Sequence, residues 1–261
     1  MVDPIGEGRF CNMKSTIFKC LIYALKNVFL SAVLIISIIA ISLLMDVPDS
    51  YGSENIGTVT GKVTVYNKKF FGGLKKKKNM SKTVVYITGF KAEAPAVIKE
   101  ISQKNERFVP DILPVVAGQR VRFPNRDKIY HNVFSISPLA TFDLGQFKDV
   151  DPHRMVTFEN YGVVPVYCNI HPKMIAYTVA LENSAFAMTD KDGNFRINDL
   201  PAGTYTINAW RPKAKRVNQE IVMLAGQNTE VHMELKEVEK IGPHRRKDGS
   251  KYPSKSNGKG Y

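Results

Sequence analysis

The chain has 261 residues, of which 44% are hydrophobic, and its formal net charge is +13. This length leaves room for one ordinary domain plus a smaller one, and it excludes an assembly of several large domains. The positive charge predicts an acidic partner or an anionic membrane surface, reached through steering that salt weakens. Nucleic acid is the lesser interpretation, because the lysine run at 75–78 has no interleaved aromatic residues that would stack on bases. We therefore expect no nucleic-acid partner.

Residues 28–45 form an uncharged, apolar run that follows Lys26 and precedes Asp46. A run of this length is typical of a hydrophobic helix that serves as a secretion signal or a membrane anchor. Since lysines precede the run and acidic residues follow it, we expect residues 1–27 in the cytoplasm and the rest of the chain outside it. Residues 46–56 then form a linker. Both outcomes stay open: an uncleaved anchor, or cleavage that releases the protein into the periplasm.

The exported part of the chain has the residue pattern of an all-β protein. Apolar and polar residues alternate over 59–65 and an apolar run follows at 84–87, so we expect two strands paired as a hairpin. Further strands are expected over 120–123, 163–167 and 175–180. Residues 141–153 are rich in Asp, Gly and Pro, and we expect a loop there.

Four side chains with metal-binding atoms lie at the ends of these predicted strands. Cys168, His171 and Met174 share one short loop before an apolar strand, and His131 begins another apolar run. Two imidazoles, a thiolate and a weakly held thioether are the ligand set of a blue-copper electron-transfer centre. Soft sulfur donors stabilise Cu(I), while imidazoles suit both oxidation states. The pattern therefore predicts a single type 1 copper ion.

Each of these residues taken alone also has a purely structural interpretation. Met174 could fill the core and His131 could be an ordinary hydrogen-bonded histidine at a strand end. The cysteines favour the metal site, because Cys11 and Cys20 precede the apolar run and Cys168 is the one exported thiol. An unpaired thiol in an oxidising compartment is protected when it binds a metal.

The histidine count argues against enzymatic copper chemistry. A multicopper oxidase or a copper nitrite reductase needs many more imidazoles than the five that this chain contains. An electron carrier also needs no open coordination position, whereas catalytic metals generally keep one. We therefore expect that the protein is not an enzyme.

Three stretches together resemble the cupredoxins: residues 123–127, residues 131–135 and the loop 168–174. The short spacing from His to Met is most similar to amicyanin, within the amicyanin and plastocyanin type of blue-copper proteins. More broadly, the region from about 57 to 212 resembles exported cupredoxin-like proteins often labelled methylamine utilisation proteins. The resemblance implies a Greek-key β-sandwich, which we place at 57–181, and outer-sphere electron transfer.

The same resemblance implies roles for individual residues. It gives the ligands as His131, Cys168, His171 and Met174. In cupredoxins the first histidine of such a loop usually reaches the surface through an apolar patch. By this analogy His171 is the point where the electron leaves, with Ile170 and Pro172 in the patch. Lys173 beside them favours a redox partner with an acidic surface.

The C-terminal part of the chain predicts a second, smaller β module. Residues 192–195 and 200–205 resemble the carboxypeptidase-regulatory-like, transthyretin-type β-sandwich. We place this module at 182–236, which is short for an independent core, so we expect it to dock on the larger sheet or to borrow the strand near Gly57. Residues 237–261 are basic and poor in apolar residues, and a disordered tail is expected there.

Two functions are compatible with this sequence. The first is an extracytoplasmic mononuclear blue-copper protein that carries single electrons between redox partners and is either attached to the membrane by its N-terminal segment or released from it. The alternative is a copper delivery, storage or scaffolding protein whose β module contacts protein or glycan. Reversible redox chemistry distinguishes them, and the methionines are scattered rather than clustered as in delivery proteins.

Overall fold

A computed structural model describes residues 55–69, 72–238 and 244–253, which belong to one compact unit, Glu54–Tyr261. Every regular element among these residues is a β-strand, which confirms the all-β expectation for them. In this described part of the chain no helix has the length and apolar character needed to cross a membrane. The hydrophobic helix expected at 28–45 lies outside the described residues.

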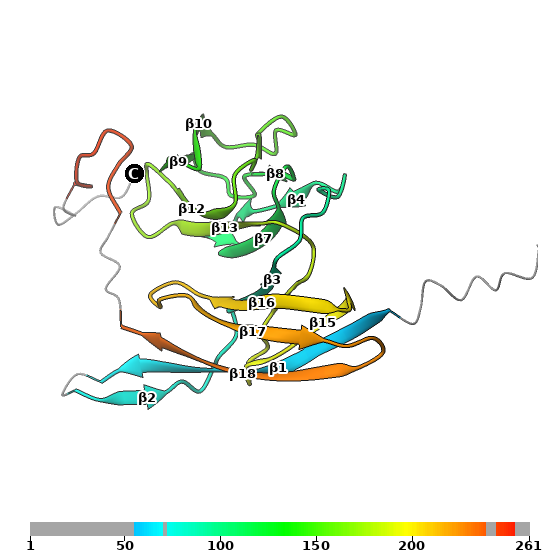
Figure 1. Cartoon of the computed structure of the whole chain (residues 1–261). Helices are drawn as coiled ribbons and strands as arrows, with labels where there is room; N and C mark the ends of the chain where they lie inside the picture. Colours follow the sequence, from blue (N-terminus) through cyan, green and yellow to red (C-terminus); the bar gives the residue numbers. More distant parts are fainter. Residues whose placement is uncertain (1–54, 70–71, 239–243, 254–261) are drawn as a thin grey trace, which may run out of the picture. The chain divides into compact units, whose positions relative to one another are not determined.

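One β-sandwich contains a five-stranded sheet in the order β10-β9-β12-β13-β7 (Figure 1). Its strands are β7 (Ile112–Val116), β9 (His131–Ser137), β10 (Ala140–Phe147), β12 (Gly162–Tyr167) and β13 (Ile175–Leu181). The facing strands are β4 (Lys99–Glu100), β8 (Arg120–Arg122) and β11 (Met155–Thr157), with the short pair β5 (Ser102–Gln103) and β6 (Phe108–Val109). Buried side chains from both sheets, including Val121, Phe123 and Val164, form a common core.

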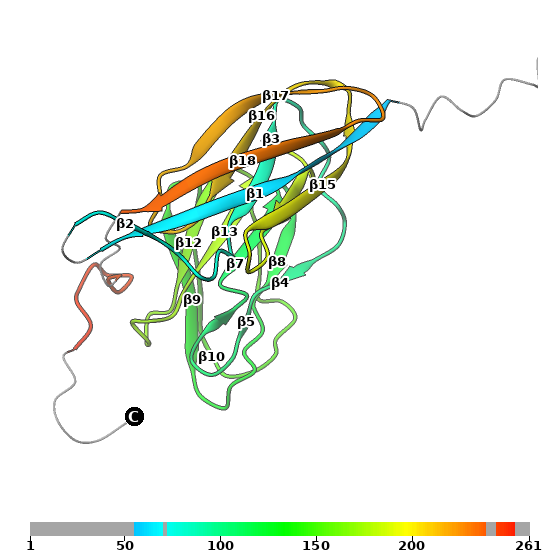
Figure 2. The same cartoon turned by 90° about the horizontal axis from the view of Figure 1, so that it is seen from below.

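A second β-sandwich is built around the long strand β1 (Ile56–Lys68). One sheet has the order β15-β1-β18, with β2 (Leu74–Lys76) paired to β1, and the other has the order β14-β3-β16-β17. The other strands are β3 (Val84–Thr88), β14 (Phe186–Met188), β15 (Asn194–Pro201), β16 (Gly203–Trp210), β17 (Val217–Met223) and β18 (Asn228–Glu237). Figure 2 shows β1 and β18 side by side, where they form a parallel pair.

The strand pairing departs from two expectations. β1 and β3 do not form a hairpin, because β1 pairs with β2, β15 and β18 while β3 pairs with β14 and β16. The lysine-rich segment provides β2, which forms the antiparallel pair with β1 in place of β3. The expected loop at 141–153 is also wrong in its first half, where β10 pairs with β9 and most of its side chains stay partly or fully exposed.

Strand β3 explains how the short C-terminal module obtains a core. Val85 and Ile87 point into the core of the second sandwich. Val84 and Tyr86, on the opposite face, pack with residues of β7 and β13 in a separate buried cluster. The module therefore uses β1 and β3 from the range 57–181: it borrows the strand near Gly57, and it also packs against the five-stranded sheet.

Candidate metal centre

The loop with the predicted ligands is fixed at both ends by strand pairing. Tyr167 at the end of β12 is the pairing partner of Ile175 at the start of β13, so residues 168–174 form the connection between two antiparallel strands. Tyr167 also pairs with Phe134 of β9. This pairing places His131, the first residue of β9, beside the loop.

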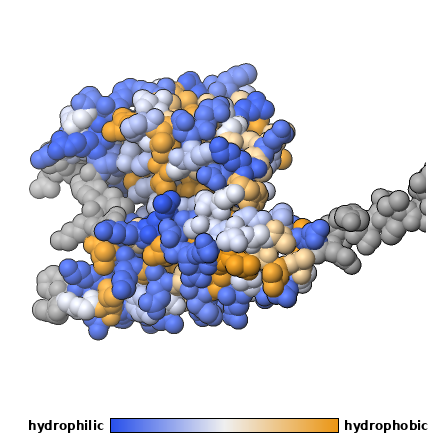
Figure 3. All heavy atoms as spheres, viewed as in Figure 1, coloured by the Kyte–Doolittle hydropathy of each residue, from blue (hydrophilic) through white to orange (hydrophobic). Residues whose placement is uncertain are grey.

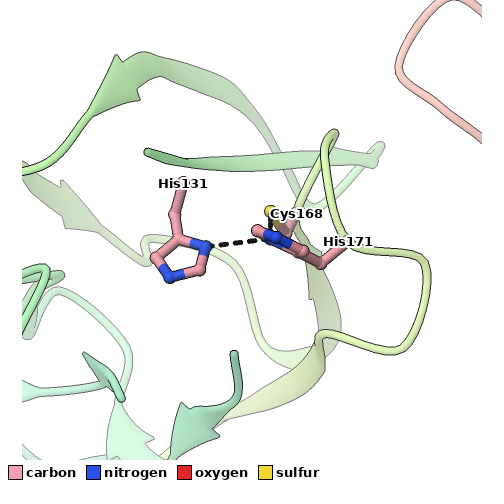
Figure 4. A group of neighbouring side chains, drawn as sticks. All are labelled: His131, Cys168 and His171. Carbon is pink, nitrogen blue, oxygen red and sulfur yellow. Dashed lines mark hydrogen bonds between the residues drawn. The ribbon is translucent and has the colours of Figure 1, made fainter. Parts of the chain in front are cut away.

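Three donor atoms converge at this point. The ligand atoms of His131, Cys168 and His171 all lie within 4.8 Å of one another. The two Nδ1 atoms of His131 and His171 are 3.0 Å apart, and the Sγ atom of Cys168 is 3.7 Å from Nδ1 of His171 (Figure 4). His131 comes from a strand and the other two come from the loop. Ring nitrogens and a sulfur atom that face one another in this way can share a proton or enclose a cation.

Asp127 determines which nitrogen of His131 faces the cluster. Its carboxylate lies 2.8 Å from Nε2 of His131 and also accepts hydrogen bonds from the backbone N–H groups of Asn105 (2.7 Å) and Glu106 (3.0 Å). Because a carboxylate only accepts, Nε2 carries the proton and Nδ1 is free to act as a donor atom toward a metal. Burial alone would raise the pKa of Asp127, but the hydrogen bonds from Glu106, His131 and Asn105 lower it overall.

The environment of Cys168 favours the thiolate. Its side chain is completely buried, which alone would raise the pKa of the thiol. Hydrogen bonds from the His131 side chain and from the backbone of Asn132, His171 and Ile170 outweigh burial and lower that pKa. The Ile170 N–H donates to Sγ at 3.4 Å. The thiolate is the form of cysteine that binds metals.

The pKa values of the two histidines shift in opposite directions. Burial would lower the pKa of His131, but the neighbouring Cys168 and Asp127 raise it overall. Burial, followed by the charge of His131, lowers the pKa of His171. These directions favour proton binding at His131 and disfavour it at His171. A metal ion that binds Nδ1 of His131 and Sγ of Cys168 competes with protons for both atoms.

Met174 closes the loop through its backbone. Its N–H donates to the carbonyl of His171 (3.0 Å), and its carbonyl accepts from the N–H of Cys168 (3.2 Å). The Met174 side chain is completely buried in the same core cluster as Cys168. This position is compatible with both interpretations of the sequence, a core residue and a thioether ligand. Ligation by Met174 stays a prediction.

The predicted electron-transfer surface lies at the outer side of the loop. His171 and Ile170 are half-buried, and Pro172 and Lys173 are exposed. Figure 3 shows hydrophilic residues over most of the face in view, with hydrophobic residues interspersed among them. The role of these four residues in electron transfer stays a prediction.

Sequence reasoning missed the residues that hold the ligands in place. Asn125 donates through Nδ2 to the carbonyls of Ile129 (2.9 Å) and Phe147 (2.8 Å), and its Oδ1 accepts from the N–H of Asp127 (2.9 Å). These bonds fix the turn that presents Asp127 to His131. The sequence contained a signal for this contact, because Asp127 lies four residues before His131.

The expectation of a disordered tail at 237–261 is wrong for residues 244–253. These ten residues, which we call the C-terminal arm, have a turn of their own and contact the ligand loop. Glu237 still belongs to β18. Low hydrophobicity gave no hint of this arrangement, because the arm is held largely by hydrogen bonds and by two aromatic rings.

Comparison with known proteins gives one family match. Residues 175–236 match the family described as "Carboxypeptidase regulatory-like domain". The matched range begins at β13 and contains β14 to β18, so it includes most of the second sandwich. A comparison with curated proteins gave no match.

Several solved structures are similar at low sequence identity. A purple cupredoxin from Nitrosopumilus maritimus has 22% identity and a TM-score of 0.29, and the match covers 32% of this chain and 99% of that one. Amicyanin from Paracoccus versutus has 18% identity and a TM-score of 0.30, with coverage of 37% and 97%. A Cu-containing nitrite reductase from Thermus scotoductus has 23% identity and a TM-score of 0.31, with coverage of 36% and 24%. The named family that the sequence itself matches is thus the carboxypeptidase regulatory-like domain, over residues 175–236.

Proposed function

We propose that the protein is a mononuclear copper protein that carries single electrons. The observation that carries this proposal is the convergence of Nδ1 of His131, Sγ of Cys168 and Nδ1 of His171 within 4.8 Å of one another. The donor set fits copper, because one thiolate and two imidazoles, with a thioether in the same loop, suit both Cu(II) and Cu(I). Structural zinc sites use the same donors except the thioether, so Met174 favours copper over zinc.

The protein supplies a site that is organised before the metal binds. Asp127 holds His131 in the tautomer that presents Nδ1. Hydrogen bonds from backbone N–H groups help to lower the pKa of Cys168, which favours its thiolate. Both ends of the ligand loop are fixed by the pairing of β12 with β13. A bound copper ion supplies one-electron chemistry through the Cu(II)/Cu(I) couple. A rigid site of this kind changes little between the two states, which favours fast electron exchange.

Burial of the site supports a carrier rather than an enzyme. The side chains of His131, Cys168 and Met174 are completely buried, so a substrate has no direct path to them. His171 is the one member of the set that is half-exposed. We propose that electrons pass at His171, beside the exposed residues Pro172 and Lys173. The positive charge of Lys173 suits an acidic redox partner in a small, transient complex.

The proposed location follows from the N-terminal sequence. The apolar run 28–45, with lysines before it and acidic residues after it, supports export of the rest of the chain. A single exported cysteine that binds copper is compatible with an oxidising compartment. We propose that the β-sandwiches lie outside the cytoplasm, either attached through this segment or released after its cleavage.

The visible spectrum of the full-length chain loaded with Cu(II) tests the function. We expect an intense thiolate-to-copper band at about 600 nm that a reductant bleaches reversibly, as this ligand set produces. The band should be lost in Cys168→Ser and retained in His153→Ala, since His153 is exposed and lies outside the cluster. A colourless protein, or one that binds only Cu(I), would contradict electron transfer and favour copper delivery, storage or scaffolding.

A further inference from the structure

The C-terminal arm contacts the ligand loop at Cys168 itself. The hydroxyl group of Tyr252 donates a hydrogen bond of 2.5 Å to the backbone carbonyl of Cys168, although the two residues are 84 positions apart in sequence. The N–H of Cys168 is bonded to the carbonyl of Met174, and its sulfur accepts from the N–H of Ile170. Both peptide groups of Cys168 and its sulfur atom are therefore held, and the arm provides one of these three restraints.

The arm also contacts the residues on either side of Cys168. The ring of His244 stacks on the ring of Tyr167, with centroids 4.6 Å apart and an interplanar angle of 27°. The backbone N–H of Lys247 donates to Oδ1 of Asn169 at 2.9 Å. Three successive residues, from the end of β12 into the loop, thus each have a partner in the arm. A chance surface contact does not follow the chain in this way.

The arm is itself closed into a compact turn. Arg246 and Ser250 are joined by a backbone hydrogen bond of 3.0 Å, and Gly249 adopts a positive φ of 81° that favours glycine. The rings of His244 and Tyr252, near its two ends, pack edge to face at 5.2 Å. The turn brings these two rings to the loop together. The arm is therefore organised as one unit rather than attached at a single point.

A side-chain ion pair ties the arm to the first sandwich as well. Nζ of Lys247 lies 2.5 Å from a carboxylate oxygen of Asp143 in β10. Asp143 in turn accepts a 2.6 Å hydrogen bond from the side chain of Asn132, the residue after His131. The arm therefore has contacts on the loop that carries Cys168 and, through Asp143, on the strand that carries His131.

We propose that the C-terminal arm is a clamp on the ligand loop and that Tyr252 is a positioning residue for Cys168. The clamp restricts the backbone at Cys168 and covers that side of the loop. Its importance for electron transfer rests on the proposed function, but the clamp exists independently of a bound metal. It should therefore protect the thiol in the metal-free protein and fix the sulfur position in the copper protein.

Alkylation of Cys168 in the metal-free, full-length protein tests the clamp directly. N-ethylmaleimide labelling followed by peptide mass spectrometry separates Cys168 from Cys11 and Cys20. We expect Tyr252→Phe to label Cys168 about fivefold faster, which is the factor for one net hydrogen bond of typical strength. A chain that ends before His244 should label faster still.

Tyr161→Phe is the matched control, because it removes a hydroxyl at the opposite end of β12 from the loop. We expect its labelling rate to equal that of the wild type. Equal rates for the wild type, Tyr252→Phe and the shortened chain would overturn the clamp. This result would not depend on whether the protein binds copper.

The visible band of the copper-loaded protein tests the positioning role separately. If Tyr252 fixes the sulfur, Tyr252→Phe should shift the maximum of the thiolate-to-copper band while copper stoichiometry stays unchanged. A purely structural role would lower the yield of folded protein without moving the band. An unmoved band in Tyr252→Phe would overturn the positioning role. A wild-type protein without any such band would contradict the proposed function and leave the labelling result standing.

Discussion

Nε2 of His131 lies 2.8 Å from a carboxylate oxygen of Asp127, four residues earlier in the chain. The carboxylate is itself held by two backbone N–H groups, so it cannot easily turn away. This contact decides that Nδ1 of His131, rather than Nε2, faces Cys168 and His171. A carboxylate behind a metal-binding histidine fixes the tautomer and makes the imidazole a stronger donor.

Removal of this carboxylate should weaken metal binding without removing a ligand. We expect Asp127→Ala to lower copper affinity by about 10- to 100-fold, because the His131 ring loses the partner that fixes its tautomer. Competition with a chelator of known affinity measures this change. Asp127→Asn retains an acceptor oxygen and should recover part of the affinity. If Asp127→Ala binds copper as tightly as the wild type, the proposed role of Asp127 is wrong.

The role of Met174 can be assigned by a substitution that keeps the volume of its side chain and removes its sulfur atom. Met174→Leu keeps the volume of this buried side chain, so the free energy of unfolding should change by about 1.5 kcal/mol or less. If the thioether binds copper, the same substitution should change the reduction potential and the visible spectrum, because the axial ligand tunes both. Urea unfolding of the metal-free protein and voltammetry of the copper protein provide the two measurements. Stability and potential that both stay near wild type would assign Met174 to the core alone.

An ionic cluster around Glu100, which includes Arg126 beside Asp127 in the chain, should make stability depend on pH. Glu100 accepts hydrogen bonds from the hydroxyl of Ser102 (2.6 Å) and from Arg126 (2.6 Å) and Arg122 (2.9 Å). Burial alone would raise the pKa of Glu100, but these hydrogen bonds lower it to about 2. Because the folded-state pKa of Glu100 lies below the ordinary value of 4.5, its contribution to stability is complete above that value and is lost as the pH falls toward 2.

Urea unfolding of the metal-free protein at a series of pH values checks this dependence. We expect Glu100→Gln to be less stable than the wild type at pH 7 and to approach it as the pH falls through the window given above. Glu93→Gln removes an exposed carboxylate and is the control for a general change in net charge. A difference between Glu100→Gln and the wild type that stays constant from pH 7 to pH 2 would contradict the assignment.

The packing between β13 and β16 offers a test of how the two sandwiches support each other. The rings of Tyr177 and Trp210 meet edge to face with centroids 5.6 Å apart. Such pairs contribute about 0.5–1.5 kcal/mol beyond the burial of their area. A double-mutant cycle with Tyr177→Leu and Trp210→Leu should give a coupling energy of this size in urea unfolding. The cycle of Tyr177→Leu with Tyr205→Leu is the control, because Tyr205 packs against Phe90 instead. Additive effects for Tyr177 and Trp210 would show that the contact contributes nothing specific.

The sequence predicted the loop of the site well because its signals are local. Apolar strands on both sides and the close spacing of Cys168, His171 and Met174 identify the loop without knowledge of the fold. The convergence of His131 with this loop was inferred from the ligand set, and the pairing of Tyr167 with Phe134 provides its structural cause. Nothing local shows that pairing, since it joins strands that are far apart in the chain.

The errors also have physical causes. Residues 84–87 show no alternation of apolar and polar side chains, because alternate residues enter two different cores. The partner strands of this run therefore could not be deduced from the sequence. The C-terminal arm has few apolar residues, and most of its contacts are polar, such as the hydrogen bond of Tyr252 to the carbonyl of Cys168 and the ion pair of Lys247 with Asp143. Composition measures hydrophobic burial, and it does not detect a segment that is held by polar contacts.

Lys173 allows the proposed electron-transfer surface to be tested without a natural partner. It is exposed on the ligand loop two residues after His171. If electrons pass at His171, the rate of reduction by the anion hexacyanoferrate should depend on the charge at this position. We expect Lys173→Glu to slow the reaction about threefold to tenfold at low ionic strength, with the difference shrinking as salt screens the charge. Stopped-flow measurement of the visible band follows the rate.

A control of equal charge change distinguishes local from general electrostatics. Lys215→Glu changes an exposed residue of the second sandwich, in the connection between β16 and β17. Both variants are compared at the same series of salt concentrations, and we expect Lys215→Glu to slow the reaction less than Lys173→Glu, because the effect of a charge on the rate falls with its distance from the exit point. Equal slowing by both substitutions would mean that net charge alone sets the rate. Electron transfer would then have no preferred exit at His171, and the surface formed with Ile170 and Pro172 would have to be abandoned.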